Sequence, residues 1–188
     1  MTKILITGAN GQLGSELRNL LDERGVAYDA FDSNQMDITD QAVVNEKISA
    51  LKPKVIYHCA GYTAVDKAED VVKDHDKLIV VNDQFGCPTW TRILAEFMTY
   101  LVDQDQPFGI YQLSNEGTCS WYEFATEILK NKGVEVAPVD SSVYPAKSYC
   151  PHHSVMSLKK AKDTGFEIMD WKVALGEFIG EIKRQNEI

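Results

Sequence analysis

The chain has 188 residues, with 19 lysines and arginines against 28 aspartates and glutamates, and a formal net charge of -9. This acidic balance argues against non-specific nucleic-acid binding, which needs clustered Lys and Arg. No apolar run reaches the roughly 18 residues of a membrane helix. The four cysteines are widely spaced, without a C-x-x-C pair, which favours reduced thiols. We therefore expect a cytoplasmic protein with no nucleic-acid partner and no membrane segment.

The first part of the chain alternates between strand and helix patterns. Apolar runs predict strands at 3–7, 26–32 and 54–60. Leucines at helical spacing predict a helix over 12–24, which Gly25 closes. Thr39 is the predicted N-cap of a second helix that ends near residue 51. Strands separated by helices indicate a parallel sheet built from right-handed βαβ units.

The second part has a different pattern, typical of a small α+β lobe. Strands are predicted at 77–81, 109–113 and 135–139. Helices are predicted at 90–103, at 121–130 behind a Ser120–Glu123 capping box, and after Asp170. The fold class is therefore α/β, a partial Rossmann-like parallel sheet with a small C-terminal α+β lobe. The predicted domains are a partial dinucleotide-binding domain over 1–76 and a substrate-type lobe over 77–188.

A glycine-rich turn joins the first strand to the first helix. It reads Thr7-Gly8-Ala9-Asn10-Gly11-Gln12-Leu13-Gly14, with the spacing G-x-x-G-x-x-G. Such glycines allow a tight turn, close approach to a pyrophosphate and close helix–strand packing, while the helix N-terminus attracts the anion. An acid at the end of the second strand, Asp32, is placed to bond a ribose hydroxyl. A purely structural turn is the weaker alternative.

These features predict a set of cofactor-binding residues for NADH or NADPH. Asp32 would repel a 2′-phosphate, and the turn itself carries no Arg or Lys, which favours NADH weakly. Asp37 and Ile38 are placed to lie against the adenine, although a solvated turn is nearly as good an interpretation. The full predicted set is Gly8, Asn10, Gly11, Gln12, Leu13, Gly14, Asp32, Asp37, Ile38, Ala60, Gly61 and Tyr62.

Several motifs together resemble the dTDP-4-dehydrorhamnose reductases, extended members of the short-chain dehydrogenase/reductase superfamily. They are ILITGANGQLGSEL at the start, MDIT at 36–39, YHCAGYTAVDKAE at 57–69, VVNDQFGCPTWT at 80–91, YQLSN at 111–115 and PVDSSVYPAK at 138–147. The resemblance implies NAD(P)H-dependent reduction of the 4-keto group of dTDP-6-deoxy-L-lyxo-4-hexulose to dTDP-L-rhamnose, for cell-wall polysaccharide. It also implies a sugar-nucleotide site toward the C-terminal lobe. The predicted substrate-binding residues are Thr63, Gln84 and Trp90, with a role in shaping the loop as the alternative for Gln84 and core packing as the alternative for Trp90.

The chain departs from this family in its catalytic segment. The superfamily uses a Tyr-x-x-x-Lys pair, in which the tyrosine protonates the developing alkoxide. None of the eight tyrosines is followed four residues later by lysine, so no catalytic residue is predicted. The family pattern breaks off near Asp70 and resumes at Val71 or Val72, with roughly a hundred residues missing, about half a Rossmann domain. Cys150 also stands where the family usually has arginine.

We expect the shortened junction to form one helix over 63–76, followed by a strand at 77–81 that pairs at the edge of the first strand. A homodimer through an exposed sheet edge is the competing outcome. Cys150, His152 and His153 cluster in sequence, but no further ligand is identifiable, so no metal is predicted. Three functions remain open: an impaired reductase, a non-catalytic nucleotide-binding or regulatory partner protein, and a non-functional deletion remnant.

Overall fold

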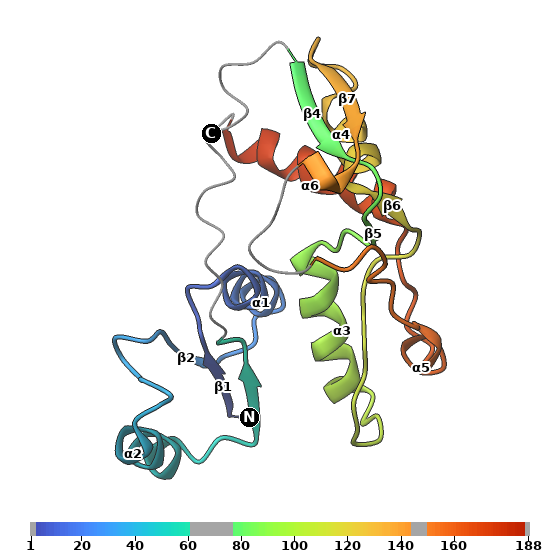
Figure 1. Ribbon diagram of the computed structural model, residues 1–188. Helices are drawn as coiled ribbons and strands as arrows, with labels where there is room; N and C mark the ends of the chain where they lie inside the picture. Colours follow the sequence, from blue (N-terminus) through green and yellow to red (C-terminus); the bar gives the residue numbers. More distant parts are fainter. Residues whose placement is uncertain (1–2, 61–76, 144–149, 187–188) are drawn as a thin grey trace. The chain divides into compact units, whose positions relative to one another are not determined.

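The computed structural model describes residues 3–60, 77–143 and 150–186 (Figure 1). The chain forms two compact units. The first contains residues 3–60 together with Leu94–Tyr100, and the second contains the other described residues. The domain boundary that the sequence places at residue 76 falls outside the described residues, so this division remains a prediction.

The first unit is built on a three-stranded parallel sheet. Its elements are β1 (Ile4–Thr7), α1 (Gln12–Glu23), β2 (Asp29–Phe31), α2 (Gln41–Leu51) and β3 (Val55–His58). The strand order is β2-β1-β3, so β1 is central. The predicted parallel sheet and its three strands are confirmed, although each strand is shorter than its apolar run.

The core of this unit lies between the sheet and α1. Ile4 and Ile6 alternate along β1 onto the face that α1 covers, where Leu17 and Leu20 meet them. The middle of α3 (Thr91–Asp103) adds Ala95 to the same cluster. Leucines at helical spacing therefore bury one side of α1.

The ends of the two helices follow local rules. Gly25 follows α1 with φ +64°, as predicted for a residue that ends a helix. The predicted N-cap of α2, Thr39, is wrong by one residue. The Asp40 side chain accepts from the backbone N–H groups of Ala42 and Val43 and is the N-cap. Thr39 instead donates both its N–H and its hydroxyl to Asp37 Oδ1.

The second unit contains two small sheets and several helices. β4 (Lys77–Val81) pairs in parallel with β7 (Glu135–Val139), and β5 (Phe85–Gly86) pairs antiparallel with β6 (Cys119–Ser120). The helices are α4 (Trp121–Leu129), α5 (Lys159–Lys162), α6 (Trp171–Asn186) and the short 3-10 turn η2 (Ser141–Val143). The Ser120–Glu123 capping box opens α4 as predicted. Asp170 accepts from the Lys172 N–H at the start of α6.

The predicted pairing of residues 77–81 with the first strand is wrong. β4 pairs with β7 over its whole length, from Lys77 beside Glu135 to Val81 beside Val139. The physical reason is that β1 offers no free edge, because β2 and β3 occupy both of its sides. The predicted junction helix over 63–76 lies outside the described residues.

The strand predicted at 109–113 does not form. This segment has no strand partner in the described part of the chain, and the fully exposed Phe108 precedes it. Two side-chain contacts hold it instead. The Tyr111 hydroxyl donates to the Pro107 carbonyl, and Lys160 Nζ donates to the Ile110 carbonyl. Apolar alternation alone therefore does not make a strand where no neighbouring strand accepts its hydrogen bonds.

Among the described residues, no helix is long and apolar enough to cross a membrane.

Candidate functional site

The glycine turn after β1 is sterically closed to larger residues at two positions. Gly8 has φ +70°, and a Cβ there would lie 2.5 Å from the Ala60 backbone nitrogen. A Cβ on Gly14 would lie 2.1 Å from the Gly8 carbonyl oxygen. The turn therefore packs directly against the chain after β3 and against the first turn of α1, which only glycine allows.

The turn leaves the start of α1 available to an anion. The N-cap is Gly11, which makes no side-chain capping bond to the helix. Its own N–H donates to the Gly8 carbonyl at 3.1 Å, and the Ala9 N–H donates to the Phe31 carbonyl at 3.1 Å. These bonds fix the turn at the carboxyl end of the sheet, where the positive end of the helix dipole favours phosphate.

A cavity of about 230 Å³ lies beside this turn. Seven residues of the predicted cofactor set line it: Gly8, Asn10, Gly11, Asp32, Asp37, Ile38 and Ala60. Ser33, Met36 and Cys59 also line it and were missed, because their side chains carry no dinucleotide motif. The structure thus brings together most of the predicted set around one cavity.

The other predicted residues lie elsewhere. Gln12, Leu13 and Gly14 form the first turn of α1 and do not line the cavity, and Leu13 packs on the core of the first unit. Gly61, Tyr62 and Thr63 lie outside the described residues. Their assignment to cofactor and substrate stays a prediction.

Asp32 is held by three donors. Its Oδ1 accepts the backbone N–H groups of Asn34 at 2.9 Å and Gln35 at 3.2 Å, and its Oδ2 accepts Asn10 Nδ2 at 2.7 Å. A carboxylate offers about four acceptor positions, so Oδ2 keeps one for a ribose hydroxyl. The predicted role of Asp32 is therefore compatible with its contacts.

Arg18 on α1 is a cation close to this site. Its Nη1 donates to Asn10 Oδ1 at 3.2 Å and to the Ala9 carbonyl at 3.4 Å, while its Nε is buried without a hydrogen-bond partner. Sequence reasoning considered only the glycine turn itself and missed it. Its position one helical turn after Gly14 is the signal that could have found it. The sequence argument for NADH over NADPH rested partly on a turn without Arg or Lys, and Arg18 contacts that turn from α1.

Two side chains of the cavity wall have shifted pKa values. The backbone N–H of Thr39, and then its hydroxyl, lower the pKa of Asp37 by bonding to its carboxylate. Burial raises the pKa of the Cys59 thiol to about 11. Cys59 is therefore a neutral, poorly nucleophilic wall residue at neutral pH.

The second unit contains a separate cavity of about 370 Å³ at the loop after β4. Gln84, a predicted substrate-binding residue, lines it, together with Phe85, Trp121 and Phe124. Trp90 does not line it. Its ring packs against Phe178 with centroids 6.3 Å apart, and its backbone N–H donates to Asn115 Oδ1. Of the two described substrate predictions, Gln84 lines this cavity and Trp90 does not.

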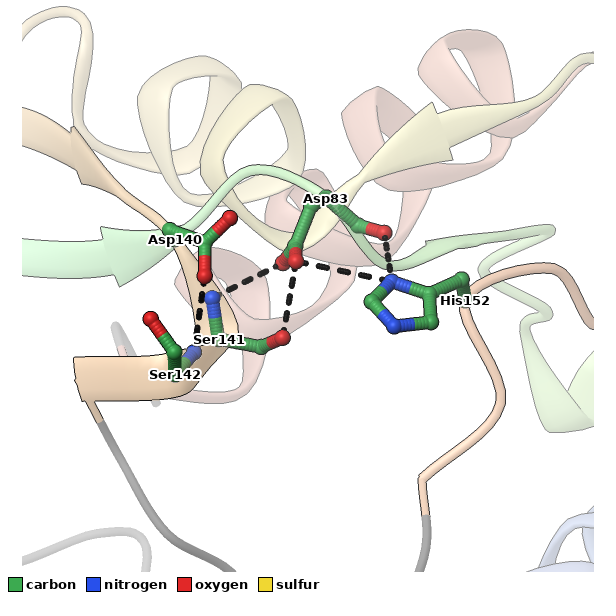
Figure 2. Close-up of polar contacts among 5 residues, drawn as sticks. All are labelled: Asp83, Asp140, Ser141, Ser142 and His152. Carbon is green, nitrogen blue, oxygen red and sulfur yellow. Dashed lines mark hydrogen bonds and ion pairs between the residues drawn. The ribbon is translucent and has the colours of Figure 1, made fainter.

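Asp83 joins three segments near this loop (Figure 2). Its carboxylate accepts the Ser141 N–H at 3.1 Å and the Ser141 hydroxyl at 2.7 Å. His152 Nδ1 lies 2.9 Å from the Asp83 carbonyl oxygen and 3.4 Å from Oδ2. Ser141 donates to the carboxylate and not to the imidazole, so this is no Ser-His-Asp catalytic relay. The network holds the loop after β4 in place. No group of three potential metal ligands occurs in the described residues.

The sequence matches the model of one protein family in two overlapping stretches. The family is described as the RmlD substrate binding domain, and the matches cover residues 1–79 and 70–184. A curated relative, the spore coat polysaccharide biosynthesis protein SpsK of Bacillus subtilis, is 26% identical over 279 residues, covering 96% of this chain and 98% of the relative. The dTDP-4-dehydrorhamnose reductase of Streptomyces griseus is 26% identical over 278 residues, with 92% and 91% covered.

Two solved structures have the same fold. A dTDP-4-dehydrorhamnose reductase from Clostridium acetobutylicum gives a TM-score of 0.87 at 25% identity, with 97% of this chain and 100% of that chain covered. The enzyme of Bacillus anthracis, solved in complex with NADP, gives 0.86 at 22% identity, with 96% and 100% covered.

The comparisons also locate the missing segment. The alignment with the B. subtilis relative extends over 279 residues, whereas this chain has 188, so the relative contains residues that this chain lacks. The two family matches meet at residues 70–79, where the sequence motifs break off and resume. The chain therefore belongs to the RmlD substrate binding domain family, with an internal deletion relative to its full-length members.

Proposed function

We propose that this chain binds NADH or NADPH at the glycine turn and is a dTDP-4-dehydrorhamnose reductase whose catalytic step is impaired. The observation that supports the proposal most is the cavity beside Gly8, Asn10 and Asp32. Gly8 and Gly14 allow the close backbone packing that holds this turn beside the cavity. Relatives solved with NADP have the same fold.

Each part of the site has a defined task in this proposal. The turn amides and the start of α1 hold the diphosphate, and Asp32 Oδ2 accepts a ribose hydroxyl. Bound NAD(P)H supplies a hydride. A dTDP-sugar ketone is the proposed acceptor, with Gln84 at the cavity in the second unit as its candidate contact.

The proton-transfer step lacks its donor. No Tyr-x-x-x-Lys pair exists anywhere in the 188 residues. General acid catalysis contributes about a hundred- to ten-thousand-fold to such reactions, so we expect turnover to be lower by a factor of that order than in full-length relatives. The same absence favours the second candidate function, a nucleotide-binding partner protein that does not turn over.

Two measurements test the proposal. The first follows the fluorescence of NADH and of NADPH on titration with the protein, and the second follows NAD(P)H oxidation with the 4-keto sugar nucleotide. Saturable binding with turnover far below that of a full-length relative supports an impaired reductase. Binding with no detectable turnover supports the partner protein. Absence of binding would defeat both, and a rate equal to that of a relative would defeat the impairment.

A matched pair of variants ties binding to the site. Asp32→Asn keeps the size of the side chain but weakens the acceptor for the ribose, so cofactor binding should fall about tenfold, a loss of about 1.4 kcal/mol. Asp29→Asn removes a carboxylate from the start of β2 that does not line the cavity, and it should leave binding unchanged. Equal effects of the two variants would point to net charge and not to the site.

The proposed partners are a dTDP-sugar and, through an exposed sheet edge, a second copy of the chain.

A further inference from the structure

One edge of the three-stranded sheet is open in the described part of the chain. β3 stands at the end of the order β2-β1-β3. Val55 and Cys59 direct their N–H groups toward the first strand, to the Lys3 carbonyl at 3.3 Å and the Thr7 carbonyl at 3.0 Å. Alternate residues of a strand point their backbone groups to opposite sides. The N–H and C=O of Ile56 and His58 therefore face away from β1.

The side chains of this edge suit contact with another polypeptide. Ile56 is 47% exposed although it lies in the middle of the strand. The stretch from residue 51 to residue 60 contains no aspartate or glutamate, in a chain with a net charge of -9. The opposite edge is different, since β2 has only three residues, begins at Asp29 and is followed by Asp32. Like charges would face each other if two β2 edges met.

The deletion accounts for the absence of a further partner strand for β3 among the described residues. The family matches overlap at residues 70–79, shortly after β3 in the sequence, so the segment that relatives possess would follow this strand. In this chain the next described strand, β4, pairs with β7 in the second unit. An edge with unpaired backbone groups is a template for association with another strand.

From this edge we infer that β3 pairs antiparallel with β3 of a second copy, which specifies the homodimer named above. A two-fold axis between the two Tyr57 residues places Ile56 opposite the partner's His58. Residues opposed in this way exchange two N–H···O=C bonds, and the outward groups of Ile56 and His58 are those required. The two-fold axis generates the same pair a second time, with His58 opposite the partner's Ile56. Both copies therefore use the same surface.

The same register avoids a clash of charges. Val55 comes to lie opposite the partner's Cys59, an apolar pair, and Lys54 comes to lie opposite the partner's Ala60. The cationic Lys54 therefore does not face its own copy. The two three-stranded sheets would join into one continuous sheet.

The experiment measures the mass of the full chain in solution against protein concentration, by sedimentation and by light scattering. Ile56→Lys places a charge on the proposed contact while the side chain remains half-exposed in the monomer. Ile79→Lys on β4 is the matched control, because Ile79 is 46% exposed and also lies in a strand. Circular dichroism and a thermal melt check that both variants fold. Amide hydrogen exchange at Ile56 and His58 reports the backbone bonds directly.

The expected result is a concentration-dependent dimer that Ile56→Lys weakens at least tenfold and Ile79→Lys leaves intact. The Ile56 and His58 amides should gain protection in the dimer and lose it in Ile56→Lys. A monomer at all concentrations overturns the inference. A dimer that Ile56→Lys leaves unchanged also overturns the inference. These readouts use no nucleotide, so the dimer and the cofactor site can fail independently.

Discussion

Asn10 Nδ2 donates to Asp32 Oδ2 at 2.7 Å, which joins the glycine turn after β1 to the end of β2. The bond spans 22 residues of sequence and links the two groups that a dinucleotide contacts at its phosphates and at its ribose. Asn10 in turn accepts from Arg18 at 3.2 Å. The site is therefore a connected polar chain and not a set of separate contacts.

The Asn10–Asp32 bond should pre-organise the ribose acceptor. In Asn10→Ala, the Asp32 carboxylate loses one of its three donors, so its orientation is less fixed. We expect cofactor affinity to fall about five- to tenfold, which corresponds to about 1 kcal/mol for a typical hydrogen bond. Fluorescence titration of NADH checks it. Asn34→Ala is the control, because Asn34 contributes only its backbone N–H to Asp32, and unchanged affinity in Asn10→Ala would contradict the role.

Arg18 should favour NADPH over NADH. A 2′-phosphate near Asp32 brings further negative charge, and the Arg18 guanidinium is the cation held within this polar chain. Arg18→Gln should therefore weaken NADPH binding several-fold more than NADH binding, because only NADPH carries the extra phosphate. The ratio of the two dissociation constants, measured at low salt, is the readout. Lys3→Gln removes an exposed cation before β1 and should leave the ratio unchanged.

The sequence predicts the glycine turn and its surroundings well, for a local reason. Gly8 and Gly14 are required by contacts between neighbouring elements, and Asp32 follows a strand whose position the βαβ rule fixes. Arg18 could not be predicted in this way, because no sequence motif marks it and the helical geometry of α1 alone brings it near the turn.

The pairing of strands depends on the whole chain and was predicted less well. β4 carries the same apolar pattern whether it pairs with β1 or with β7, and only the occupied edges of β1 decide. The segment 109–113 likewise has strand-forming residues but no described partner. Local pattern determines which residues favour a strand, whereas the available neighbours determine whether one forms.

The capping box of α4 should contribute to stability. Ser120 accepts the Glu123 N–H at 3.1 Å, donates to Asn82 Oδ1 at 2.8 Å, and its own N–H donates to Glu123. Ser120→Ala removes the hydroxyl from a buried position and should lower the free energy of unfolding by about 1–2 kcal/mol. Urea unfolding measures the change. Glu123→Gln retains a side-chain acceptor for the Ser120 N–H, so it should lower the free energy of unfolding by less than Ser120→Ala does. A larger loss in Glu123→Gln than in Ser120→Ala would contradict the capping role.

Asp37 should make stability depend on pH in acid. Its pKa is lowered in the folded protein by the Thr39 N–H and then the Thr39 hydroxyl, from an ordinary value of 3.8. The stabilisation is therefore fully present above pH 3.8 and is lost as the pH falls through the lower, folded-state pKa. Unfolding curves of the wild type and Asp37→Asn should differ above this range and converge below it. In Thr39→Val the hydroxyl is lost but the N–H remains, so an intermediate difference is expected.

Three of the four cysteines, Cys150, Cys59 and Cys119, should react with iodoacetamide in an order set by exposure and pKa. Cys150 is exposed, whereas burial raises the pKa of both Cys59 and Cys119 to about 11. Because the thiolate is the reactive form, Cys150 should be alkylated well before Cys59 and Cys119 at pH 8, as peptide mass spectrometry would show. Cys59 also lines the cavity beside the glycine turn, so NADPH should slow its alkylation further while Cys119, in the second unit, keeps its rate. Equal protection of Cys59 and Cys119 would indicate a general tightening of the fold, and no protection of Cys59 would place the cofactor elsewhere.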